Sequence, residues 1–190
     1  MAFVLVPLLV LVVLALVVMS LYNGLVRARN ACDAAWADVD VELRRRHDLV
    51  PNLVETVKGY AAHERGTLEA VTAARNAAVS TQAARAPAGE LARDESALVG
   101  GLRQIFALSE RYPQLKADAN FRDLQAQLAE TENRIESGRR DFNGLVRQFN
   151  TQAQSFPGNL VAGAFGFKAR DFFELTEPEA REAPKVSFKA

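Results

Sequence analysis

The N-terminal segment constrains this chain more than any other feature. The first 26 residues carry no charged side chain, and the 20 residues from Phe3 to Tyr22, FVLVPLLVLVVLALVVMSLY, contain nothing more polar than Ser20. About 20 consecutive apolar residues are enough to span the hydrocarbon core of a bilayer. A secretory signal would instead have a basic start, a shorter apolar run and a small-residue cleavage site. We therefore predict an uncleaved transmembrane anchor over residues 1–22.

The charges that flank this segment predict its orientation. No Lys or Arg precedes the span, whereas Arg27 and Arg29 follow it closely and Arg44, Arg45 and Arg46 lie further on. Basic residues near a transmembrane segment favour the cytoplasmic side. The sequence thus predicts a single-pass protein with its N-terminus outside and its larger part in the cytoplasm.

Composition limits what the rest of the chain can be. Its 190 residues suffice for one sizeable core, and 23 basic side chains are balanced by 23 acidic ones. A neutral chain has no excess positive field to hold a polyanion, which argues against nucleic acid as a partner. The single cysteine, Cys32, has no partner for an internal disulfide, and we expect it to pack as a small apolar residue.

Apolar spacing predicts that the membrane helix continues into the soluble part. Apolar positions follow steps of four and three from Leu21 to Val39, with no strong helix breaker before Pro51. Asp48 suits a helix N-cap, and proline is tolerated in a first turn but not in a helix interior. We therefore expect a turn near residues 47–51. A long second helix then follows, from about residue 51 to about Ala84.

The remaining pattern completes an all-α fold. A connection is expected at residues 85–90, followed by a third helix that ends at Pro113. Asn120 is the expected N-cap of a fourth helix, which runs to about Ala153. Its predicted core stripe comprises Phe121, Leu124, Leu128, Thr131, Ile135, Gly138, Phe142, Leu145 and Phe149. Short connections favour an antiparallel up-and-down four-helix bundle over residues 23–155.

The C-terminal region differs in character. Residues 156–175 are rich in Phe and Gly, and residues 176–190 are typical of a disordered tail. Helix lengths predict that the fourth helix delivers the Phe-rich segment to the bilayer. There it could enter the interface with Lys168 and Arg170 toward anionic lipid, or fold back and cap the bundle or a neighbouring subunit. The apolar residues concerned are Phe156, Leu160, Val161, Phe165, Phe167, Phe172 and Phe173.

Residues 38–64 raise the question of catalysis, because they hold both histidines and three consecutive arginines. His47 and His63 are 16 positions apart, about 24 Å on one helix, which is too far for a shared metal ion. The stretch HERGT has Thr67 where a zinc hydrolase needs its second histidine. We predict no catalytic, cofactor-binding or metal-binding residues. The residues from Arg44 to Arg46 are explained by solvation and by capping a helix C-terminus, with a partner surface as the alternative.

Several segments resemble the bacterial LemA family. The similarity is carried by residues 21–78, by RYPQLKADANF, by FNTQAQSFPGNLVAGAFGF and by the terminal PKV, including Tyr22, Asn23, Arg29, Asn30, Trp36, Asp40 and the run from Arg45 to Tyr60. The resemblance implies a small bacterial inner-membrane protein with one N-terminal span and a cytoplasmic helical domain. It supplies no catalytic residues. Relatives associated with magnetosome membranes and with genes for membrane proteases imply accessory or scaffolding work.

These observations predict a non-enzymatic function. The leading hypothesis is a non-enzymatic scaffold or interaction module at the inner membrane, whose partners are the lipid bilayer, an unknown protein and, through self-assembly, further copies in a homo-oligomer. The alternative is an accessory factor for membrane remodelling or for a membrane protease, with the Phe-rich segment as its working part. An uncharacterised hydrolase is the third hypothesis.

Overall fold

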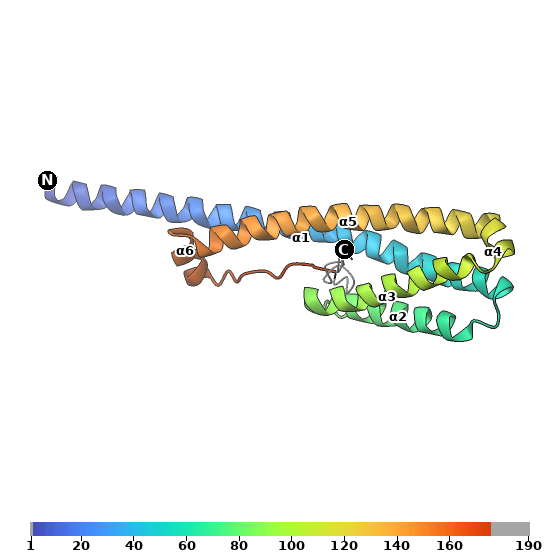
Figure 1. Cartoon of the computed structure of the whole chain (residues 1–190). Coiled ribbons are helices and arrows are strands. Elements are labelled where there is room, and N and C mark those ends of the chain that lie inside the picture. Colours follow the sequence, from blue (N-terminus) through green and yellow to red (C-terminus); the bar gives the residue numbers. More distant parts are fainter. Residues whose placement is uncertain (1, 176–190) are drawn as a thin grey trace, which may run out of the picture. The chain divides into compact units, whose positions relative to one another are not determined.

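The computed structural model of this chain describes residues 2–175, and within them it contains helices and no strand, so the predicted all-α class is confirmed (Figure 1). The predicted disordered tail, 176–190, lies outside the described residues. The helices are α1 (Ala2–Tyr60), α2 (Arg65–Ala83), α3 (Ala88–Ser109), α4 (Pro113–Ala117), α5 (Ala119–Gln154) and α6 (Gly158–Phe165).

The helices divide into two compact units. The paired-helix unit comprises Met1–Val41 and Arg134–Phe172, and thus holds the first part of α1, the second part of α5, and α6. The hairpin unit comprises Glu42–Asn133 together with the described residues from Phe173 on. The long helices α1 and α5 therefore contribute to both units, and the hairpin unit is inserted between the two halves of the paired-helix unit.

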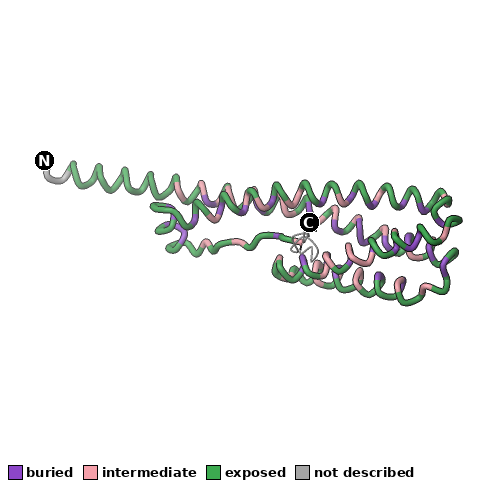
Figure 2. The backbone as a smooth tube through the Cα atoms, in the orientation of Figure 1, coloured by how far each residue is buried: buried purple, intermediate pink, exposed green. Residues whose placement is uncertain are grey.

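The part of α1 from Leu5 to Met19 is apolar and exposed. Large side chains from Leu5 to Met19 are exposed, for example Leu9 at 65%, and Figure 2 shows this stretch as exposed throughout. Among the described residues, α1 is the one helix long and apolar enough to cross a membrane. A helix that is apolar on all sides needs an apolar environment. These properties are those expected of the predicted anchor.

Helix α1 does not end at Pro51, and the predicted turn at residues 47–51 is wrong. Proline has no backbone N–H, so the carbonyl of His47, four residues earlier, loses its helical partner. Nε of Arg75 in α2 donates a hydrogen bond to that carbonyl at 3.1 Å. Because the unpaired acceptor is satisfied from outside, α1 continues to Tyr60. Asp48 is consequently an exposed mid-helix residue and caps nothing.

The true turn comes later, and the second helix is correspondingly short. α2 has 19 residues, about 28 Å at 1.5 Å per residue, instead of a helix beginning near residue 51. The predicted long second helix from about residue 51 to about Ala84 is therefore wrong at its start. α2 and α3 form a close-packed hairpin. A Cβ at Gly101 of α3 would lie 2.8 Å from Cγ2 of Val71, so only glycine permits this approach.

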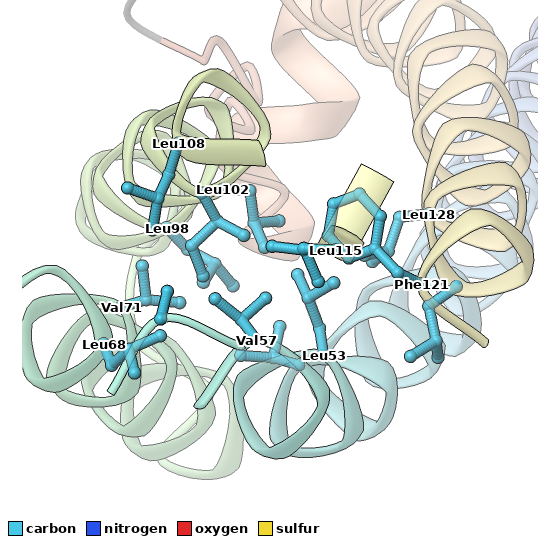
Figure 3. Close-up of a cluster of buried hydrophobic side chains, with 14 of the residues drawn as sticks. Leu53, Val57, Leu68, Val71, Leu98, Leu102, Leu108, Leu115, Phe121 and Leu128 are labelled. Atoms are coloured by element: carbon cyan, nitrogen blue, oxygen red, sulfur yellow. The ribbon is translucent and has the colours of Figure 1, made fainter. Parts of the chain in front are cut away.

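The core of the hairpin unit lies between its helices. Figure 3 shows apolar side chains from every helix of the unit gathered together. Leu115 of the five-residue α4 is fully buried among them, which explains why this short helix is held in place. The labelled members are Leu53, Val57, Leu68, Val71, Leu98, Leu102, Leu108, Leu115, Phe121 and Leu128.

Helix α5 follows the predicted core stripe. Seven of the nine predicted positions are buried, and Gly138 and Leu145 are half-buried. Its start differs from the prediction, because Oδ1 of Asp118 accepts the backbone N–H of Phe121 at 2.8 Å. The N-cap is therefore Asp118, two residues before the predicted Asn120. The short helix α4 fixes this boundary by ending immediately before Asp118.

The paired-helix unit brings α1 and α5 into close contact. A Cβ at Gly138 would lie 3.0 Å from Cγ2 of Val39, so the small residue allows a close approach here. The rings of Trp36 and Phe142 meet beside it, with centroids 5.1 Å apart. Large aromatic groups thus fill the space that two long helices leave between them.

Candidate functional site

A buried charged cluster lies in the hairpin unit, centred on Arg46 of α1. This arginine is 0% exposed and donates to Oε2 of Glu95 at 2.5 Å and to Oε2 of Glu132 at 2.6 Å. Glu95, on α3, is also fully buried, whereas the side chain of Glu132, on α5, is 42% exposed. One guanidinium therefore links three helices through two carboxylates.

His47 extends the cluster. Its Nε2 lies 2.8 Å from Oε1 of Glu95, so both carboxylate oxygens of Glu95 have partners. The backbone carbonyl of the same histidine accepts Arg75 of α2. Arg46 and His47 together thus connect α1, α2, α3 and α5. Because Arg46, His47 and Glu95 are buried and Glu132 is the one member with substantial exposure, we interpret the cluster as structural.

These positions correct two predictions. Arg46 was expected to be solvated and to cap a helix end, but it is buried in the middle of α1, while Arg44 is exposed. His47 was expected beside a turn and is buried, whereas His63 is exposed in the turn at residues 61–64. Within residues 2–175, no group of three or more His, Cys, Asp or Glu side chains is arranged to hold a metal ion.

The cluster had a signal in the sequence. Leu43, Arg46 and Val50 continue the three-and-four spacing of the buried face of α1. Glu95 lies in the same phase as Leu91 and Leu98 on α3. Two opposite charges that each occupy a core position on a different helix indicate a buried ion pair.

Polar contacts fix the turns of the hairpin unit. The hydroxyl of Tyr60 donates to Oδ2 of Asp118 at 2.9 Å. The pKa of the Asp118 carboxyl is lowered from its ordinary 3.8, first by the Phe121 backbone N–H and then by this phenol. The same hydrogen bond raises the pKa of Tyr60. Glu64 accepts the hydroxyl of Tyr112 at 3.3 Å, which ties the turn after α1 to the turn after α3. These groups position helices.

An aromatic cluster lies in the paired-helix unit where the apolar part of α1 ends. The ring of Tyr22 is 4.8 Å from that of Phe165 and 5.7 Å from that of Phe167, between centroids. Phe167 also faces Phe149 of α5 at 6.4 Å, and the guanidinium of Arg29 lies 5.5 Å from its centroid. These contacts are favourable edge and cation–π geometries. The Phe-rich segment is therefore folded against α1 and α5.

Hydrogen bonds secure the chain after α6. The side chain of Asn150 accepts the backbone N–H of Arg170 at 2.8 Å and donates to its carbonyl at 2.9 Å. The Arg170 guanidinium pairs with Asp33 of α1 at 2.6 Å. Gly158 makes the entry to α6 possible, since a Cβ there would lie 2.2 Å from the backbone oxygen of Gln152.

The segment presents two different faces. Val161 and Ala162 of α6 are buried, at 5% and 3% exposure. Phe156, Leu160 and Phe165 are exposed, at 80%, 64% and 57%. Part of the segment therefore folds back onto the helices, as one alternative predicted, and part remains as an uncovered apolar surface. Phe156 lies just before α6, and Phe165 contacts Tyr22 but keeps an exposed side. We call the exposed apolar surface of Phe156, Leu160 and Phe165 the apolar face of α6.

A groove of about 570 Å³ opens on the hairpin unit between the end of α1 and α2. Its apolar lining includes Val54 and Leu68. Lys58, Glu55, Arg65 and Glu69 supply charges of both signs along it. The remaining lining residues are Ala62, Thr72, Ala73 and Asn76. A groove with an apolar floor and charged margins suits a partner helix better than a small metabolite.

Cys32 packs as predicted. It is fully buried on the α1 face that turns toward the interior of the paired-helix unit. Burial disfavours the thiolate and raises the pKa of the thiol. A buried thiol of raised pKa is a poor nucleophile.

Comparison with known proteins places the chain among bacterial relatives. The family model described as LemA family matches residues 35–188. Magnetosome protein MamQ 2 of Paramagnetospirillum magneticum is 26% identical over 188 residues, covering 87% of this chain and 68% of the relative. MamQ of Magnetospirillum gryphiswaldense is 25% identical over the same shares. Protein LemA of Metamycoplasma hominis is 24% identical over 157 residues, covering 83% of this chain and 70% of the relative.

Proposed function

Because this chain belongs to the LemA family, we propose that it is a single-pass membrane protein that works as a non-enzymatic scaffold or interaction module. It is a membrane-associated helical protein in which one helix carries the exposed apolar stretch. Our proposal adds that the hairpin unit binds a protein partner, and that the protein can self-assemble.

The observation that carries this proposal is the continuity of α1. The helix begins within the apolar stretch and ends, at Tyr60, beside the groove of the hairpin unit. Pro51 does not interrupt it, because Arg75 satisfies the carbonyl that the proline leaves free. One uninterrupted helix therefore supplies both the anchor and a wall of the binding surface.

The groove defines the chemistry of the partner. Val54 and Leu68 offer apolar contact, and Lys58, Arg65 and Glu69 can pair with either charge. An amphipathic helix with an apolar stripe and mixed flanking charges satisfies both requirements. Such a helix could belong to another protein or to a second copy of this chain.

Site-specific photo-crosslinking in intact membranes tests the groove. A photoreactive residue replaces Ala73, which is exposed in the groove, or Ala126, which is exposed on α5 of the same unit. We expect a defined crosslinked species from position 73 and none from position 126. Equal or absent crosslinking at the two positions would contradict a partner site in the groove.

Orientation belongs to the same proposal. Arg27 and Arg29 directly follow the apolar span, which favours an N-terminus outside the inner membrane and a cytoplasmic hairpin unit. A reporter that is active only in the cytoplasm should work when fused after Ala190. Activity of a periplasm-dependent reporter at that position would reverse the orientation.

A second candidate function is accessory work in membrane remodelling or beside a membrane protease. It is favoured by the exposed apolar face of α6, and the relatives named as magnetosome proteins agree with a role at a membrane-bounded structure. Two variants separate the candidates. Filling the groove with Ala73→Trp should abolish function if partner binding is the role. Replacing Phe156, Leu160 and Phe165 by Ser should abolish it if remodelling is the role.

A further inference from the structure

We propose that α6 makes a second contact with the bilayer, in which Phe156, Leu160 and Phe165 enter the boundary between lipid headgroups and acyl chains. This inference rests on the membrane anchoring of the proposed function and adds a lipid-binding surface to it. It is independent of the groove, because the groove lies in the hairpin unit and α6 lies in the paired-helix unit.

The position of the segment is the first support. Tyr22 is the last residue of the apolar span, and tyrosine is enriched at the membrane–water interface. Phe165 and Phe167 contact the Tyr22 ring directly, at 4.8 and 5.7 Å between centroids. Side chains in ring contact with the end of a transmembrane helix lie at the depth of the lipid headgroups.

The segment is also fixed at that depth. Asn150 forms two hydrogen bonds with the backbone of Arg170, and the Arg170 guanidinium pairs with Asp33 at 2.6 Å. These contacts attach the chain after α6 to α5 and to α1. The apolar face is thus held in place by polar contacts formed elsewhere in the segment.

The distribution of buried and exposed residues on α6 supports lipid as the partner that covers its apolar face. Val161 and Ala162 are buried on the inner side of α6, whereas Leu160 and Phe156 are largely exposed, and Phe165 stays 57% exposed beside its contact with Tyr22. Contiguous exposed apolar surface marks a membrane or protein contact. Phe165 contacts Tyr22, which lies one helical turn after Met19, and Met19 is 56% exposed on the apolar part of α1. A bilayer that surrounds Met19 also reaches the neighbouring apolar face of α6.

Charges near the segment suit an interfacial helix. Arg27 and Lys168 are exposed, and Arg29 lies over the Phe167 ring. Basic side chains at this level can face lipid phosphates while aromatic side chains enter the boundary. Asp171 is an exposed acid in the same stretch, so we expect apolar insertion, and not anionic lipid alone, to hold the segment.

Lipid quenching of a fluorescent label tests the inference in the full chain. An environment-sensitive dye is attached to Ala164→Cys, to Ser137→Cys or to Val12→Cys, each in a Cys32→Ala background, and the protein is reconstituted in phosphatidylcholine–phosphatidylglycerol vesicles. Ala164 and Ser137 are both exposed in the paired-helix unit. Ser137 lies about 26 Å along α5 from Gln154. Spin labels on the lipid headgroup or deep in the acyl chain act as quenchers.

We expect the dye at position 164 to be blue-shifted and quenched by headgroup-labelled lipid several-fold more than the dye at position 137. Position 12 should be quenched by the deep label. Equal quenching at 164 and 137, with position 12 still quenched, would overturn the α6 contact and leave the anchor intact. Loss of quenching at position 12 would overturn both. A blue shift at 164 that depends on protein concentration without lipid quenching would mean that a second copy covers the face, which also overturns the inference.

A charge placed on the apolar face provides the matched variant. Leu160→Asp should reduce quenching at position 164 several-fold, because a carboxylate is expelled from the acyl boundary. Asn159→Asp adds the same charge to a neighbouring polar, exposed position of α6 and should leave the quenching close to that of the parent. Similar quenching in the two variants would contradict insertion of Leu160.

Discussion

The two units use the same pair of helices, α1 and α5, and fill their interiors with opposite chemistry. In the paired-helix unit the interior is aromatic and aliphatic, as in the contact between Trp36 and Phe142. In the hairpin unit the apolar core is joined by a buried ionic cluster centred on Arg46 and Glu95. We attribute this difference in side-chain chemistry to the number of helices in each unit whose relative positions must be fixed.

Two helices can be aligned by shape alone. Gly138 allows α1 and α5 to approach closely, and large rings fill the space beside it. Several helices packed on Leu and Val could slide along one another at little cost, because apolar contacts have no direction. The guanidinium of Arg46 reaches the carboxylates of both Glu95 and Glu132 in only one arrangement of their helices. We therefore interpret the cluster as the device that sets helix register.

The largest expected effect is in the hairpin unit. Glu95→Ala leaves Arg46 buried without its main partner and should lower the free energy of unfolding by about 4 to 5 kcal/mol. Glu110→Ala is the matched control, because the ion pair of Glu110 with Lys116 is similarly short, at 2.6 Å, but both side chains are exposed. That control should cost no more than about 0.5 kcal/mol. Urea unfolding in detergent, followed by circular dichroism, measures both.

A double replacement sharpens the interpretation. Arg46→Met with Glu95→Leu removes both buried charges and should recover most of the stability lost in Glu95→Ala, because an apolar pair carries no desolvation cost. If register is the role, the double variant should lose helix order in the hairpin unit, seen as faster amide hydrogen exchange in α2 and α3. Unchanged exchange would mean that the apolar core alone sets the register.

The next effect is in the paired-helix unit. Phe142→Ala should cost about 3 to 4 kcal/mol, because the cavity beside Trp36 can collapse only in part. Arg140 forms an exposed pair with Glu136 at 3.2 Å, so Arg140→Ala should cost less than about 0.5 kcal/mol. Comparable losses in the same urea assay would show that the stripe of α5 does not carry the stability of this unit.

Two glycines of α6 should respond in opposite directions. Gly158→Ala places a methyl group 2.2 Å from the backbone oxygen of Gln152 and should cost about 1 to 3 kcal/mol by forcing α6 away from α5. Gly163 has open space around its Cβ position, so Gly163→Ala should stabilise α6 by about 0.5 to 1 kcal/mol. Protease sensitivity at residues 155–158 should rise in the first variant only.

The smallest expected change in the free energy of unfolding concerns the continuation of α1 beyond Pro51. Arg75→Met removes the donor to the His47 carbonyl and should cost about 1 kcal/mol. In a Pro51→Ala background the helix supplies its own donor, so the same change should cost about 0.5 kcal/mol less. Additive losses in this double-mutant cycle would show that Arg75 does not compensate for the proline.

The predictions from sequence agree with the structure for segments whose conformation depends mainly on their own residues. The apolar anchor segment and the α5 stripe depend on local composition and spacing, and both patterns match the structure. Pro51 was misjudged because its outcome depends on Arg75, 24 positions away in sequence and visible only once α2 is placed. The N-cap of α5 was misplaced by two residues because the short helix α4 fixes where the chain turns.

The buried cluster shows a different limit of sequence reasoning. Three consecutive arginines suggest a solvated surface, and only the helical phase of Leu43 and Val50 separates Arg46 from Arg44 and Arg45. The predicted core stripe of α1 ends at Val39, so it does not include Leu43, Arg46 and Val50, whose spacing would have indicated the burial of Arg46. For the Phe-rich segment, both lipid entry and folding back were expected as alternatives, but the sequence predicted no α6 and could not separate buried Val161 from exposed Leu160, because that separation depends on the neighbouring helices.

The insertion of the hairpin unit between the halves of the paired-helix unit implies an order of folding. Residues 42–133 contain all the partners of the ionic cluster, so this part of the hairpin unit can fold before the second half of α5 has been synthesised. The pair between Arg46 and Glu132, at 2.6 Å, then joins the two points where the chain leaves the unit. The loop that α1 and α5 must close to bring Trp36 against Phe142 becomes a short one, and its entropic cost falls accordingly. Until then the core-facing side of α1 in the paired-helix unit is uncovered, and uncovered apolar surface in a partly folded chain favours aggregation.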